Sequence, residues 1–147
     1  MTTAKQTLFD AVGGLPTLQR VHRIFYDKIY AHDWLKQFFE GHSQQAIENR
    51  QTSFMAEKMG GPVEYWGKEM KMAHQSMYIT AELFDLRHSL LEESLREAGV
   101  PEKLRQRWLR IDNAFRKNIV KDSIASFYSV TWKYRKRTIV PKPAVGK

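Results

Sequence analysis

Residues 60–79 read GGPVEYWGKEMKMAHQSMYI and place one histidine, His74, among several methionines after a segment rich in helix breakers. Gly60, Gly61 and Pro62 end any preceding helix, so the residues around His74 can form only a short helix held by its neighbours. Imidazole is the commonest metal ligand in proteins, and methionines suit the wall of an apolar cofactor slot. The pattern predicts an axial ligand presented to a large apolar cofactor such as haem, although a histidine on a partly buried helix needs no ligand at all.

The composition limits the classes of protein that the chain can form. Its 147 residues correspond to about one domain. It contains no cysteine, which excludes disulfide scaffolds, cysteine-ligated zinc and iron–sulfur sites, thiol nucleophiles and covalent haem attachment. Any haem would therefore be held non-covalently.

The charge is concentrated near the C-terminus. Of the total net charge of +8, the six Lys and Arg residues beyond Asp122 contribute +6, with no acidic residue among them, so the preceding chain is nearly neutral. No apolar run approaches the length of a membrane span, and the first residues lack the apolar core of a signal peptide. We expect a cytoplasmic protein with a basic tail.

Apolar residues recur with a helical period along most of the chain, and no long stretch alternates with period two. Ser43 and Thr80 are suited to cap helices, and Asp33 is a plausible N-cap for the short segment WLKQFF. The sequence predicts an all-α fold with helices over 7–12, 34–39, 44–59, 80–98 and 101–119, and a long helix that has Pro16 in its first turn and an apolar stripe from Leu18 to Ile29.

One residue interrupts the apolar stripe of the segment 44–59. Ile47, Phe54 and Met55 form that stripe, and Gln51 lies one turn after Ile47. A buried amide without a partner costs on the order of 1–3 kcal/mol, so Gln51 should have one. It either bonds to a backbone carbonyl at the rim of the core or points at a ligand, and the pattern alone leaves both alternatives open.

An ordered set of short motifs resembles the truncated haemoglobins, specifically their first group. The set comprises LFDAVGG, FYDKIY, the FFEG turn, FMAEKMGGP, the spacing from its Gly-Gly to MKMAH, and AGVPE, and it runs from about Leu8 to Asp122. The resemblance implies a two-over-two sandwich of α-helices around haem b, with the globin domain over residues 1–125. Residues 126–147 then form a basic extension, partly helical or disordered.

The same resemblance implies roles for individual residues. His74 occupies the position of the proximal iron ligand, whereas Tyr26 and Gln51 fall on distal positions that donate hydrogen bonds to a bound ligand. Phe25, Ile47 and Met55 would line the distal pocket. The implied haem contacts are Phe39, Arg50, Phe54, Met70, Lys71 and Ile79. Arg50 would pair with a haem propionate, and its alternative is a solvated surface charge.

At two positions of the predicted distal pocket, the residue differs from the one that related globins carry. Ile47 stands where ordinary globins usually keep a distal histidine, and Met55 stands where some relatives carry a phenylalanine thought to gate an apolar tunnel. We therefore expect an open sixth coordination site without histidine, and we do not expect tunnel gating by a phenylalanine at this position.

The remaining histidines show no convergent spacing and are interpreted as surface or rim histidines. They are His22, His32, His42 and His88. No distal His and Arg pair of the kind that peroxidases use is evident.

These features lead to three functional hypotheses. The first is a haem protein that binds dioxygen, nitric oxide and carbon monoxide and, with an external flavin reductase, acts as a nitric oxide dioxygenase. The second is an oxygen carrier or sensor without nitric oxide turnover. The third is a haem-free basic module that binds nucleic acid or membrane through its tail. The tail is expected to be a solvated terminus, with docking to an anionic surface or an acidic redox partner as its alternative.

Overall fold

The structure is a computed structural model that describes residues 6–67, 73–131 and 136–143. Within these ranges every named element is a helix, and the β-type pairing is a single isolated parallel bridge between Met77 and Thr138. The all-α expectation is confirmed. None of the described helices is both long and apolar enough to cross a membrane.

The first helix begins at a capping threonine, and the second follows the expected apolar stripe. α1 (Leu8–Val12) begins at Thr7, whose hydroxyl accepts the backbone N–H of Asp10 over 3.1 Å. Gly13 has a φ of 109°, a conformation that disfavours residues with a Cβ, and it turns the chain directly into α2 (Gly14–Ala31). The predicted apolar stripe of α2 is buried at Leu18, Val21, Phe25 and Ile29.

The segment after α2 differs from the prediction in detail. WLKQFF contains the 3₁₀ helix η1 (Leu35–Phe39), and Asp33 is not its N-cap. The ring of His32 instead accepts the backbone N–H groups of Trp34 and Leu35 over 3.2 and 3.3 Å. A histidine nitrogen here satisfies the donors that a carboxylate was expected to satisfy.

The central helices begin where the caps predict. The Ser43 hydroxyl accepts the N–H of Ala46 at the start of α3 (Gln44–Lys58), and Thr80 accepts the N–H of Leu83 at the start of α5 (Ala81–Glu97). Each therefore satisfies a donor that has no partner within its own helix.

The predicted helix over 101–119 is observed as two helices, α6 (Glu102–Asn113) and α7 (Arg116–Ile119). At the junction, hydrogen bonds to the third preceding residue tighten the chain, as from Phe115 N–H to the carbonyl of Asp112. The Phe115 ring packs on Phe54 with centroids 5.1 Å apart. The apolar period continues through the junction, which explains why the sequence predicted one helix.

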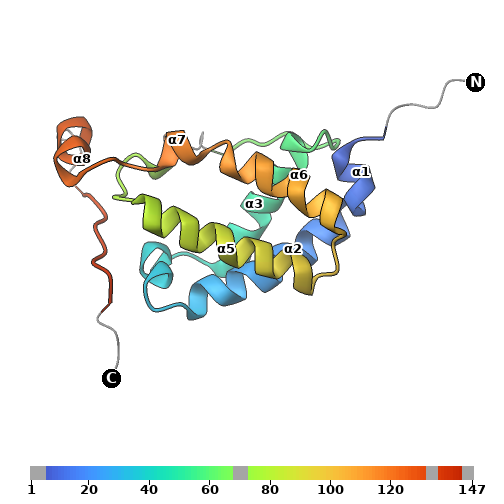
Figure 1. The fold of residues 1–147 in the computed structure, drawn as a ribbon, viewed down its shortest axis with the longest axis horizontal. Helices are drawn as coiled ribbons and strands as arrows, with labels where there is room; N and C mark the ends of the chain where they lie inside the picture. The colour runs from blue at the N-terminus through green and yellow to red at the C-terminus, as the bar shows by residue number, and fades with distance from the viewer. Residues whose placement is uncertain (1–5, 68–72, 132–135, 144–147) are drawn as a thin grey trace, which may run out of the picture.

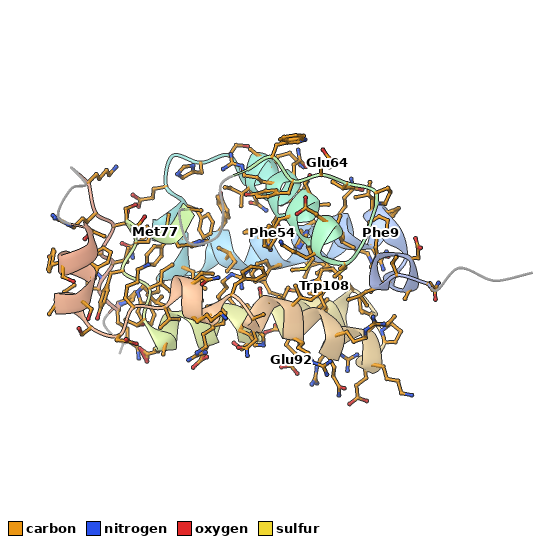
Figure 2. The ribbon with its side chains drawn as sticks, turned by 90° about the horizontal axis from the view of Figure 1, so that it is seen from above. Phe9, Phe54, Glu64, Met77, Glu92 and Trp108 are labelled. Atoms are coloured by element: carbon orange, nitrogen blue, oxygen red, sulfur yellow. The ribbon has the colours of Figure 1, made fainter. Side chains whose placement is uncertain are left out.

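The helices form two layers. α2 and α3 pack together, α5 and α6 pack together, and α2 crosses α5 between them, which is the expected two-over-two arrangement (Figure 1). Trp108 lies in the interior between the layers, whereas Glu92 points outward from α5 (Figure 2). The main core joins residues of both layers and of α1.

The C-terminal part folds back onto the protein. α8 (Ile124–Thr131) lies at the end of the molecule opposite α1 (Figure 1). Beyond it, Thr138 donates to the carbonyl of Ser76 and accepts from the N–H of Tyr78, each over 2.8 Å. The Trp34 indole donates to the carbonyl of Val140 over 3.0 Å. Residues 136–143, the C-terminal strap below, thus differ from the solvated terminus expected from the sequence.

Candidate functional site

Three aromatic side chains meet at the middle of α2. Tyr26 is 5% exposed and Phe25 is 1% exposed. The ring centroid of Tyr26 lies 4.9 Å from that of Phe25 and 6.0 Å from that of Phe39 in η1. Burial raises the pKa of Tyr26 to about 12. Tyr26 is therefore a neutral phenol near pH 7, with a proton available for donation.

α3 carries three predicted site residues at successive turns. Ile47 and Gln51 are partly buried and Met55 is 1% exposed. Among the described residues, the Gln51 amide has no side-chain hydrogen-bond partner. The backbone-carbonyl alternative of the sequence interpretation is therefore not observed. Gln51 is a partly buried donor and acceptor that a bound group can use.

His74 is helical together with Ala73, and it is partly buried. Its backbone carbonyl accepts from the Lys121 ammonium over 2.8 Å and from the N–H of Met77 over 3.0 Å. Burial lowers the pKa of Lys121 to about 8. The backbone of the predicted ligand is thereby tied to the chain that follows α7.

The predicted cofactor contacts divide into three groups. Phe39 and Ile79 are partly buried apolar residues packed against the core. Phe54 is buried between the rings of Tyr65 and Phe115, and Arg50 is exposed. Met70 and Lys71 lie outside the described residues.

A buried charged cluster beside Tyr26 was missed by the sequence interpretation. The Asp112 side chain is 6% exposed and accepts two hydrogen bonds from the Arg87 guanidinium, over 2.8 and 2.9 Å. His88 Nδ1 lies 2.8 Å from the same carboxylate. Burial opposes ionisation of Asp112, but the charge of Arg87 and the hydrogen bonds from His88 and Arg87 hold its pKa below the ordinary value. The sequence did contain a sign of this cluster, because the acidic residue Asp112 follows Trp108 by one turn on an apolar stripe.

Arg87 also contacts the aromatic cluster. Its guanidinium carbon lies 5.2 Å from the centre of the Phe25 ring, and its positive charge opposes the rise that burial causes in the pKa of Tyr26. The sequence analysis did not identify Arg87 as a neighbour of this aromatic cluster. Spacing along the chain does not reveal this contact, because Arg87 lies on α5 and meets Phe25 only where α5 packs on α2.

The interpretation of His22 as a surface or rim histidine is also wrong. Its residue is 1% exposed, its Nδ1 lies 2.7 Å from the Thr52 hydroxyl, and its ring meets the Trp108 ring edge-on at 5.8 Å. Burial lowers the pKa of His22 to about 3, so the imidazole is neutral. Its Nε2 and the Trp108 Nε1 have no partner among the described residues. The signal was its place on the stripe, between Leu18 and Tyr26.

A surface hollow of about 560 Å³ opens elsewhere, between residues 31–34, the start of α5 and the C-terminal strap. Trp34, Leu86 and Lys142 are among its lining residues. None of the predicted site residues lines it, so the candidate site rests on the residues around Tyr26, Gln51 and His74.

The sequence matches a family model described as bacterial-like globin over residues 7–121. A group 1 truncated haemoglobin of Mycolicibacterium paratuberculosis is 35% identical over 97 residues, which are 66% of this chain and 71% of the relative. One from Tetrahymena thermophila is 31% identical over 98 residues, 67% of this chain and 81% of the relative. The chain belongs to the bacterial-like globins and, among them, to the group 1 truncated haemoglobins.

Solved structures show the same fold. The ferric truncated haemoglobin of Tetrahymena pyriformis has a TM-score of 0.74 and 28% identity, with 80% of this chain and 100% of that chain covered. A group II truncated haemoglobin of Bacillus anthracis has a TM-score of 0.74 at 20% identity, covering 81% of this chain and 94% of its own. The latter likeness supports the fold alone.

Proposed function

We propose that this protein binds haem b non-covalently and takes dioxygen, carbon monoxide or nitric oxide at an open distal site. The observation that carries the proposal is the pair formed by Tyr26 and Gln51, a buried neutral phenol and a partly buried amide without a partner among the described residues. They lie on helices that pack together in a globin fold. When bound, haem supplies an iron that accepts a diatomic ligand.

The residues present fit such a group. His74 would be the proximal ligand, on a backbone held by Lys121. Phe39 and Ile79 would contact the apolar faces, with Phe54, Met70 and Lys71 completing the contacts and Arg50 pairing with a propionate. Phe39 and Ile79 support this assignment because they are apolar yet only partly buried in the protein alone. With no cysteine in the chain, no thioether attachment is available.

Tyr26 and Gln51 would act as hydrogen-bond donors to bound dioxygen. A bound dioxygen that gains partial negative charge would accept these bonds, and each bond would be worth on the order of 1.5–3 kcal/mol, roughly ten- to a hundred-fold in release rate. Phe25, Ile47 and Met55 would line the remainder of the distal pocket, and they offer no competing donor. We therefore expect the two donors, Tyr26 and Gln51, to make oxygen release slow.

The finer proposal is nitric oxide dioxygenation. Tyr26 and Gln51 would hold dioxygen, haem would supply the redox chemistry, and an external flavin reductase would supply the electrons. A carrier or sensor role would show the same spectra without nitrate formation. The haem-free module that binds nucleic acid or membrane through the tail is less favoured, because the C-terminal strap bonds to Ser76 and Tyr78 of this protein.

The first experiment records visible spectra of the haem-loaded protein, reduced and under carbon monoxide. Wild type should give the spectrum of a histidine-ligated globin. His74→Gly should lose it and regain it with added imidazole, whereas His42→Gly, at an exposed histidine, should match wild type. A wild-type protein that takes up no haem would overturn the proposal.

A second experiment addresses the reaction. The oxygenated protein is mixed with nitric oxide under rapid mixing, and nitrate and the ferric spectrum are recorded. Stoichiometric nitrate formed within the mixing time supports dioxygenation. Slow reaction, or a ferric product that flavin reductases cannot reduce, would favour the carrier or sensor role instead.

A further inference from the structure

The segment that carries His74 has little regular structure of its own. Ala73 and His74 are helical, whereas residues 75–80 contain no helix before α5 begins. Two parts of the chain beyond α7 bond to this segment, one at Lys121 and the other in the C-terminal strap. A segment that lacks helical hydrogen bonds depends on such partners for a fixed position.

Lys121 bonds to both ends of the segment 74–79. Its ammonium donates to the carbonyl of His74 over 2.8 Å, and its backbone N–H donates to the carbonyl of Ile79 over the same distance. The ammonium also donates to the carbonyl of Ile119 over 3.1 Å, which holds the Lys121 side chain at the end of α7. The side chain and the backbone of one residue thus restrain the first and last residues of the segment together.

The C-terminal strap bonds to the middle of the same segment. Thr138 donates its backbone N–H to the carbonyl of Ser76 and accepts the N–H of Tyr78, each over 2.8 Å. Of the four hydrogen bonds that Lys121 and Thr138 make to this segment, only the one from the Lys121 ammonium depends on a side chain. It is also the only one of the four that reaches the backbone of His74. Substitution of the Lys121 side chain should therefore release His74 while the other three bonds remain.

We infer that Lys121 is a positioning residue that fixes the backbone of His74 and thereby the orientation of its imidazole as the proximal ligand. This inference rests on the proposed haem site. A bond from an ammonium to a carbonyl is charge-assisted and stronger than a bond between neutral groups. A histidine held in this way presents its ring in a narrow range of orientations, as a ligand must. Loss of the ammonium should widen that range.

The proposed role has a signature that separates it from the role of distal residues. Tyr26 and Gln51 would discriminate between bound ligands, because a hydrogen-bond donor favours the ligand that is the better acceptor. Lys121 would act through His74 and would not contact the bound ligand. A change at Lys121 should therefore alter the release of dioxygen and of carbon monoxide by the same factor.

The first test measures hydrogen exchange of the backbone amides of residues 74–79 in the full-length, haem-loaded protein. Lys121→Met removes the ammonium and keeps the backbone N–H, so exchange in this segment should speed about three- to tenfold. Lys121→Arg, whose guanidinium can still donate to the carbonyl of His74, should exchange at nearly the wild-type rate. Lys117→Met removes an exposed cation of α7 and is the matched control, which should match wild type.

The second test records the iron–histidine stretching band of the reduced protein by resonance Raman spectroscopy. Lys121→Met should broaden this band and should change oxygen and carbon monoxide release by one common factor of about three or more, whereas Lys121→Arg and Lys117→Met should keep the wild-type values. His74→Gly protein supplied with imidazole tests the route, because the chain cannot orient an imidazole that is not attached to it. In that background Lys121→Met should have little effect.

The outcomes separate a positioning role from a structural one. A stretching band and release rates that Lys121→Met leaves unchanged would overturn the inference even if exchange speeds, because the bond would then support the fold alone. An equal effect of Lys121→Met in the His74→Gly protein would overturn it as well. Should Lys121→Met fail to hold haem, Lys121→Gln, which is shorter and uncharged, takes its place with the same expected results. Wild type that takes up no haem is a different result, and it removes the proposed function itself.

Discussion

The buried histidine at the crossing of α2, α3 and α6 should make the protein sensitive to mild acid. The pKa of His22 is lowered from 6.5 to about 3 by burial, so between these values the unfolded chain binds a proton that the native protein does not. The contribution of the neutral His22 to the free energy of unfolding is therefore fully present above pH 6.5. It is lost progressively as the pH decreases toward 3. The slope is about 1.4 kcal/mol per pH unit for one proton, so acidification from pH 7 to pH 5 should cost about 2 kcal/mol through this residue alone.

The perturbation that isolates this effect is His22→Gln, whose amide can still bond to the Thr52 hydroxyl but does not titrate. Urea unfolding followed by far-ultraviolet circular dichroism at pH 7, 6 and 5 gives the free energy of unfolding for each protein. Wild type should lose about 2 kcal/mol more than His22→Gln over that range. His42→Gln, at an exposed histidine, should keep the wild-type slope. Equal slopes for wild type and His22→Gln would refute the assignment of a buried neutral imidazole.

Three further outcomes follow from contacts described above. Tyr26→Phe should speed oxygen release roughly ten- to a hundred-fold, and more than Gln51→Ala does, in stopped-flow measurements; no change for either variant contradicts the distal assignment. Asp112→Ala should lower the free energy of unfolding by about 3 kcal/mol, since it leaves the Arg87 guanidinium unpaired, and a loss below about 1 kcal/mol would show that the pair is effectively solvated. Thr138→Pro removes the N–H that bonds to Ser76 and should speed haem transfer to an acceptor globin. Thr138→Ala keeps this bond and should transfer haem at the wild-type rate. Equal transfer rates for Thr138→Pro and wild type would show that the strap does not support the haem site.

The sequence predicts the helices well because their signals are local. Ser43 and Thr80 cap the helices that they were expected to cap, and the stripe of α2 is buried as its period requires. The single predicted helix over 101–119 is divided because the tightening at Phe115 accompanies a contact with Phe54, which lies in another helix. Such a contact leaves no mark on the apolar period.

The candidate site is only partly predictable for the same reason. His74, Tyr26 and Gln51 were predicted from their local patterns and from the resemblance to a family. The partners Arg87 and Asp112 are 25 residues apart and meet only when α5 packs on α6, so neither spacing nor propensity points to them. His22 and Asp112 did carry a local signal, because each interrupts an apolar stripe, and a polar residue at such a position requires a partner.

The pairing of Thr138 with Ser76 and Tyr78 links two segments that about sixty residues separate along the chain. Closing such a long loop costs entropy that helix formation in α5 and α6 must first offset, so we expect the strap to dock after those helices have formed. The strap also lies beyond residue 121, where the match to the globin family ends. The order in which this protein folds and acquires its cofactor would then depend on a segment that the family model does not cover.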